Sequence, residues 1–189
     1  MEGIFFTLIG AALFTQSWFV LGMYSEGRTM GIILGGLGLL SLTTVTAVTF
    51  APVLLTGTGG GVGADMLAET TVMKSMIVVW ALYAIGVGAH GLWDFEDRAI
   101  GFYSAFLAIA TLVPFIYFAG KLEPRYNVET WLALSGATLI LTLLAGIMFF
   151  YLAFAFNVLR LVAGWSLLLG GGSVAAIGLA IVSTVVTNS

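Results

Sequence analysis

The chain has 189 residues, of which 60% are hydrophobic and only 8% are charged, and its formal net charge at pH 7 is −3. Its mean hydropathy of +1.12 excludes a water-soluble domain, because the surface of such a domain needs charge. The chain contains no cysteine, which excludes a disulfide framework and a thiolate metal or redox site. The composition therefore predicts an integral membrane protein.

Charged and turn-forming residues divide the sequence into six long apolar segments, at about 3–23, 29–55, 73–92, 99–119, 129–155 and 162–186. About 20 apolar residues cross the hydrocarbon core as a helix, and continuous apolar runs exclude an outer-membrane barrel, whose strands alternate. The predicted fold is an all-α integral membrane protein, a single domain with a bundle of six transmembrane helices. The breaks at 56–72 and 120–128 are longer than the other three, so the longer loops fall on one face of the membrane.

The arginines and lysines do not orient the bundle, because three lie on each face. Those on the short-turn face are Arg28, Arg98 and Arg160, and those on the long-loop face are Lys74, Lys121 and Arg125. The positive-inside rule compares such counts and gives no preference here.

Few residues are available for catalysis or for binding a metal ion or a nucleic acid. A single histidine, His90, cannot form a multi-histidine metal site, and no basic patch is present for a nucleic acid. Two Gly-x-Gly-x-x-Ala strings, at 59–64 and 170–175, follow no strand of a βαβ unit and so do not predict a nucleotide site. We expect His90 to pair with Asp94, four residues later on one helix face. We predict no enzyme activity and no cofactor.

Neutral polar side chains recur inside the predicted spans. They are Thr15, Gln16, Thr43, Thr46, Thr49, Ser104, Thr111, Ser135, Thr138 and Thr142. Hydroxyl groups often bond their own helix backbone, so these side chains either do that or together line a path for a small neutral solute. Aromatic rings end the fifth span, where Phe150 and Phe154 share a face. Such rings form a slot that excludes hydrated ions, or else they face lipid as an interfacial belt.

Small residues stand four apart in several spans, where they let helices approach closely. The pairs are Gly31 with Gly35, Ala84 with Gly88, Ala133 with Ala137, and Gly171 with Ala175. We expect most of these pairs to pack helices within one protomer and some to bring protomers together.

The most distinctive pattern runs from Gly91 to Pro114 and joins a charged turn to an aromatic segment. Its residues are Gly91, Leu92, Asp97, Arg98, Tyr103, Ser104, Phe106 and Pro114. In this order they resemble the urea and short-chain amide channel family (AmiS/UreI). Three further features are similar to that family: the Gly35-Gly36-Leu37 string, the run from Phe154 to Arg160, and aromatic residues at Tyr83 and Trp165.

The resemblance implies a passive channel for urea or short-chain amides in the cytoplasmic (inner) membrane. It implies a ring-shaped homo-oligomer, a hexamer, with one pore in each protomer and lipid in the central hole. Both termini and the longer loops would then face outward. On this basis we predict a pore lining of Gln16, Tyr83, Phe102, Phe106, Phe150 and Phe154. We predict turns shaped by Asp97, Arg98 and Asn157.

The chain departs from the family at several positions. Phe156 and Gly170 stand where the family has carboxylates, and Gly146 and Phe150 stand where the urea channels have two pore-narrowing tryptophans. The substrate is therefore left open among small amides. The outward loops contain no histidine, so we predict no histidine-based acid gate. Solute flux should be nearly flat from about pH 5 to pH 8 and unchanged in direction in His90→Ala.

Two other functions remain open from the sequence. A proton-coupled carrier of small carboxylic acids, such as acetate, needs ionisable groups inside the membrane, and the Asn-Pro-Ala-Pro-Leu-Gly-Leu motif of one such family is absent. A non-transporting membrane subunit that packs against a partner enzyme or complex is compatible with the glycine-rich helices.

Overall fold

The computed structural model describes residues 2–23, 26–56, 64–120, 128–156 and 158–187. Its helices are α1 (Glu2–Leu21), α2 (Gly27–Thr56), α3 (Ala64–Trp93), α4 (Asp97–Gly120), α5 (Val128–Ala153) and α6 (Leu159–Thr187). Each of the six contains a stretch long and apolar enough to cross a membrane. The all-α, six-helix prediction is confirmed, and the chain is a multi-pass membrane protein.

Helix α3 begins earlier than the sequence predicted. It starts at Ala64, inside the loop expected at 56–72, although its membrane-crossing stretch starts only at Thr71. The first turns contain Ala, Met, Leu and Glu, which are good helix formers, and acidic residues near a helix N-terminus are favoured by the helix dipole. The polarity of Asp65 and Glu69 therefore marks the end of the apolar span and not the end of the helix.

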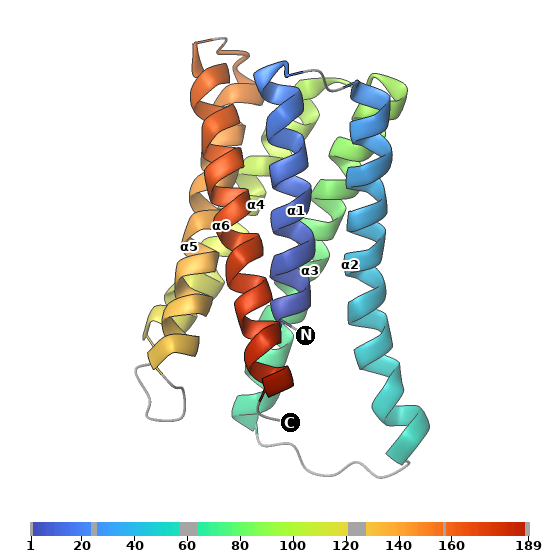
Figure 1. Cartoon of the computed structure of the whole chain (residues 1–189), viewed down its shortest axis with the longest axis vertical. Helices are drawn as coiled ribbons and strands as arrows, with labels where there is room; N and C mark the ends of the chain where they lie inside the picture. The colour runs from blue at the N-terminus through green and yellow to red at the C-terminus, as the bar shows by residue number, and fades with distance from the viewer. Residues whose placement is uncertain (1, 24–25, 57–63, 121–127, 157, 188–189) are drawn as a thin grey trace.

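The six helices stand side by side and close on themselves, with α6 beside α1 (Figure 1). The most extensive contacts join α1 with α6, α2 with α3, and α4 with α5, and the contacts between these pairs are fewer. The C-terminal ends of α1, α3 and α5 and the N-terminal ends of α2, α4 and α6 lie together at one end of the bundle, which we call the short-turn end. The opposite end, where both termini lie, is the long-loop end (Figure 1).

Glycines bring the two helices of each pair into backbone contact. A Cβ atom at Gly88 of α3 would lie 2.6 Å from the backbone nitrogen of Gly35 in α2. In the same way, a side chain at Gly10 would collide with the backbone of α6 at Ala175, and one at Gly101 would collide with the backbone of α5. Most of the small-residue pairs noted in the sequence thus pack helices within the protomer, as expected.

One face of α3 is buried along most of its membrane-crossing length. Residues three or four positions apart share a helix face, and on this face they are Met73, Met76, Trp80, Tyr83 and Val87, each at most 4% exposed. His90 continues the same face to the short-turn end with a side chain that is 17% exposed. This stripe gives the interior a row of side chains that leads inward from the surface.

Candidate functional site

A cavity of about 190 Å³ lies at the short-turn end and is walled by five of the helices. Its lining residues are Gln16, Phe19, Val20, Met30, Val87, His90, Asp94, Asp97, Ile100, Met148, Tyr151 and Leu152. One water molecule needs about 10–15 Å³ of such cavity volume, so the cavity has room for a small solute together with water. Asp94 and Asp97 are exposed, which opens this end of the cavity to the aqueous surface.

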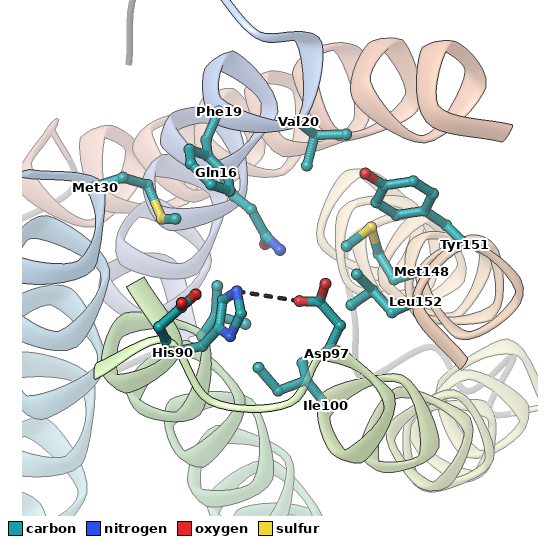
Figure 2. Close-up of a pocket in the computed structure, with 12 residues that line it drawn as sticks. Gln16, Phe19, Val20, Met30, His90, Asp97, Ile100, Met148, Tyr151 and Leu152 are labelled. Carbon is teal, nitrogen blue, oxygen red and sulfur yellow. Dashed lines mark ion pairs between the residues drawn. The ribbon is translucent and has the colours of Figure 1, made fainter. Parts of the chain in front are cut away.

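Gln16 lines the cavity and forms a neutral polar pair with Tyr83, which does not line it. Each is only 3% exposed. The Gln16 Nε2 lies 3.1 Å from the Tyr83 hydroxyl, and that hydroxyl lies 3.3 Å from the Gln16 Oε1. In Figure 2 the amide end of Gln16 points toward the space between the His90–Asp97 pair and Met148. A glutamine amide has two donor hydrogens and an acceptor oxygen, so the bond to Tyr83 leaves hydrogen-bonding capacity for a solute.

Polar groups continue past this pair into the bundle. Ser104 of α4 interacts with the Tyr83 hydroxyl. One turn of α3 further from the short-turn end, the Trp80 indole donates to the Thr111 hydroxyl at 3.0 Å. The Trp80 and Tyr83 rings meet edge to face at 5.6 Å. Three helices, α1, α3 and α4, therefore supply a sequence of neutral polar groups from the cavity toward the middle of the membrane.

The hydroxyl groups inside the spans bond their own helices, which is the structural alternative considered for them. Thr15 donates to the Ala11 carbonyl at 2.9 Å, and Ser104 donates to the Ile100 carbonyl at 2.9 Å. The same holds for Thr43, Thr46, Thr111, Ser135, Thr138 and Thr142. The side chain of Thr49 lies outside the described residues. Thr111 also accepts a bond from the Trp80 indole of α3.

The sequence predicted that His90 pairs with Asp94, but in the structure His90 pairs with Asp97. Its Nε2 lies 3.1 Å from the Asp97 Oδ1 (Figure 2). Its Nδ1 contacts the carbonyl oxygen of Phe95. The helix ends at Trp93 and Asp94 has a positive φ of 56°. Helical i,i+4 spacing therefore does not apply to Asp94, and the turn brings Asp97 to the ring.

The four predicted lining phenylalanines lie on the outer surface of the protomer. Phe102 is 61% exposed, Phe106 is 54% exposed, and Phe150 and Phe154 are each 51% exposed. Phe102, Phe150 and Phe154 gather around Phe149, with ring centroids 5.0–6.3 Å from it. None of the four lines the cavity. Of the six predicted lining residues, Gln16 and Tyr83 contact each other inside the bundle, whereas the four phenylalanines lie at its surface.

Two of the three predicted turn residues are described. Asp97 opens α4 and holds His90, whereas Arg98 is exposed and lines a neighbouring cavity of about 300 Å³ with Glu96 and Tyr151. Asn157 lies outside the described residues. Among the residues that are described, no group of three or more His, Cys, Asp or Glu side chains is placed to hold a metal ion.

Several residues that line the cavity were not predicted from the sequence. Their helical spacing from Gln16 and Tyr83 is the sequence signal that could have found them. Phe19 and Val20 follow Gln16 by three and four residues, and Val87 and His90 follow Tyr83 by four and seven residues. Residues at these spacings share a helix face. The same spacing, applied from Gln16 and Tyr83, would have extended the predicted lining to the short-turn end.

No protein-family model matches the chain. No curated protein matches its sequence either. Among solved structures, the chain is similar to the urea channel from the human gastric pathogen Helicobacter pylori, with a TM-score of 0.68 at 15% sequence identity. The likeness covers 90% of this chain and 91% of that chain. The two proteins therefore share one fold over nearly their whole lengths.

Proposed function

We propose that this chain is a passive channel for small neutral solutes, urea or short-chain amides, across the cytoplasmic membrane. The observation that carries the proposal is the cavity lined by Gln16, whose amide is hydrogen-bonded to the buried, uncharged Tyr83. The fold shared with a urea channel supports it, because that likeness spans the whole six-helix bundle.

The chemistry of the interior suits a neutral amide better than an ion. An amide that leaves water loses hydrogen bonds, and an unsatisfied amide in an apolar site costs about 1–3 kcal/mol. Gln16 and Tyr83 can replace such bonds with an amide and a hydroxyl. An ion would lose its hydration without a compensating charge, because the described charged residues lie at the ends of the membrane-crossing stretches or outside them.

The competing carrier of small carboxylic acids requires a different interior. Proton coupling needs ionisable groups within the membrane. In the described part of α3, the membrane-crossing stretch Thr71–Trp93 has Lys74 in its first turn and His90 in its last turn, with no Asp, Glu, Lys or Arg between them. The interior pair of Gln16 and Tyr83 is neutral, so passive conduction is the function that we favour over coupled transport.

We also propose that the protomers form a ring, a hexamer, with lipid in its centre and with the long-loop end facing outward. The wide exposed apolar surface of the helices, including Phe102 and Phe106, supports burial against lipid or a neighbouring protomer. Gly35 and Gly88 add no support, because they are used within the protomer. Native mass spectrometry of the detergent-extracted protein counts the protomers.

Stopped-flow measurements on proteoliposomes test the proposed function. Urea, formamide or acetamide should enter vesicles that contain the protein several-fold faster than protein-free vesicles, while sodium chloride is excluded equally by both. The exclusion of salt shows that the vesicles do not leak. If all three solutes cross no faster than through protein-free vesicles, the proposal is wrong.

A further inference from the structure

The C-terminal end of α1 forms part of the cavity wall. Gln16, Phe19 and Val20 stand three or four residues apart near the end of this helix, so they share a face, and all three line the cavity. Figure 2 shows Gln16 and Val20 on one side of this space and Met148 and Tyr151 of α5 on an adjoining side. The position of this helix end relative to α5 therefore contributes to the width of the cavity.

The turn after α1 leaves one backbone oxygen of this helix end to be satisfied from elsewhere. The Gly22 N–H donates to the Phe19 carbonyl, and the Met23 N–H donates to the Trp18 carbonyl, each at 3.0 Å. With Gly22 at a φ of 75°, these are the two bonds of a Schellman motif, a common end of a helix. The last carbonyls of a helix have no partner within it, and the two bonds of this motif do not reach the Val20 carbonyl.

Arg160, in the first turn of α6, donates to this carbonyl from across the bundle. Arg160 is an exposed residue, but its Nε is engaged, because it donates to the Val20 oxygen at 2.7 Å. A Cβ atom at Gly22 would lie 2.7 Å from the Arg160 Nη2, so the guanidinium group lies against the turn. Among the described residues, α6 supplies no side chain to the cavity lining. Through Arg160 it nevertheless holds one of the cavity's walls.

The same guanidinium group also acts on the α5 wall. Its charge lies near enough to the Tyr151 hydroxyl for an electrostatic interaction. Tyr151 lines both this cavity and the neighbouring one. An arginine carries five N–H groups in a planar fork, so one nitrogen can bond the end of α1 while the others face α5. A lysine has a single nitrogen and cannot reproduce this arrangement in full.

We propose that Arg160 is a positioning residue that sets the width of the solute cavity from behind its wall. Arg160 does not line the cavity; it fixes the end of α1 against α5 and thereby fixes the distance between Val20 and Tyr151. A site discriminates solutes by size only when its walls cannot move apart. The consequence for transport rests on the proposed function and adds its size selectivity: the fixed opening passes urea more readily than the same molecule enlarged by methyl groups.

The reactivity of a single thiol tests the positioning role without any transport measurement. The chain contains no cysteine, so Val20→Cys introduces the only thiol. Val20 is 6% exposed, and a charged thiol reagent should therefore modify this cysteine slowly in detergent. Adding Arg160→Met should raise the modification rate about fivefold, the effect of losing one hydrogen bond, because the end of α1 is then free to move.

Two further variants make this measurement specific. Arg28→Met removes the same charge from an exposed arginine in the first turn of α2, at the same end of the bundle, and should leave the rate unchanged. Arg160→Lys keeps the charge and one donor, so it should give an intermediate rate, and it serves as the test variant should Arg160→Met not fold. Equal modification rates with and without the Arg160 substitutions would overturn the proposal.

The ratio of two flux rates tests the consequence for transport. Urea and 1,3-dimethylurea enter proteoliposomes at rates from which the rates in protein-free vesicles are subtracted, and their ratio does not depend on the amount of folded protein. This ratio should favour urea in the wild type, fall about fivefold in Arg160→Met, fall less in Arg160→Lys and stay unchanged in Arg28→Met.

The outcomes separate this proposal from the proposed function. A wild type that passes both solutes equally, or an Arg160→Met variant with the wild-type ratio, refutes the size selection and leaves the channel proposal intact. A wild type that passes neither solute refutes the channel itself, and the thiol rates then decide the positioning role alone.

Discussion

Gln16 and Tyr83 each have a polar end that would be costly to bury alone. Leaving one buried donor or acceptor without a partner costs about 1–3 kcal/mol, and each of these residues satisfies the other at 3.1 Å. A passing amide can exchange these bonds for its own, because the number of hydrogen bonds is kept. The pair thus offers a neutral solute partners without placing a charge in the membrane interior.

At the same scale, the outer phenylalanines should not affect conduction. Phe150 and Phe154 are each 51% exposed and lie outside the cavity lining. We predict that Phe150→Leu and Phe154→Leu change urea flux per protomer by less than about twofold, as for exposed substitutions generally. Stopped-flow rates normalised to the reconstituted protein check this. A large loss of flux in either variant would restore these rings to the pore lining.

At the scale of the elements, the bundle is built from three helix pairs. Backbone contact at glycines makes each pair tight, whereas fewer contacts join one pair to the next. The cavity lies where the pairs meet, since its lining includes residues from α1, α3, α4 and α5. A pathway between tightly packed pairs can keep an opening that close packing within a pair would fill.

Two glycines of α3 test this arrangement as a matched pair. A Cβ at Gly88 would lie 2.6 Å from the backbone of α2, whereas nothing lies within 4 Å of a Cβ at Gly86. Gly88→Ala should destabilise the protein by about 1–3 kcal/mol through overpacking, and Gly86→Ala should be neutral or stabilising. Thermal unfolding in detergent, followed by circular dichroism, measures both. Equal unfolding temperatures would contradict the close contact of α2 with α3.

The sequence predicted the elements well and their faces poorly, for a physical reason. A membrane requires long uncharged helices, so the six spans followed from apolar length alone. Apolar length does not determine which side of a helix faces lipid, because lipid and the protein interior are both apolar. Phe150 and Phe154 were therefore placed inward although they lie outside. Gln16 was selected by its polarity and Tyr83 by the family resemblance, but their contact depends on tertiary packing. Asp97 replaced Asp94 as the partner of His90 because the helix ends at Trp93.

At the scale of the whole molecule, polar and charged groups are graded along the proposed pathway. Carboxylates and His90 stand at the short-turn mouth, the neutral Gln16–Tyr83 pair lies behind them, and the Trp80–Thr111 bond lies deeper. Water can form hydrogen bonds with a solute at the mouth, and neutral side chains can do so further in. Such a gradient lowers the cost of desolvation for a neutral molecule and does little for an ion.

The proposed function depends most on solute passing beside Gln16, and a pair of adjacent substitutions in α1 tests this most directly. Gln16→Leu removes the amide at the inner side of the cavity. Thr15→Val removes a neighbouring hydroxyl that bonds only the Ala11 carbonyl of its own helix. Tyr83→Phe, which removes only the hydroxyl on the other side of the pair, provides an independent check should Gln16→Leu fold poorly.

Urea entry into proteoliposomes, normalised to protein, should fall about tenfold in Gln16→Leu, the effect of losing one hydrogen bond of about 1.4 kcal/mol in the barrier. It should stay within about twofold of wild type in Thr15→Val. Equal urea entry through wild type, Gln16→Leu and Tyr83→Phe would contradict the account, because solute would then cross by a path that avoids the pair.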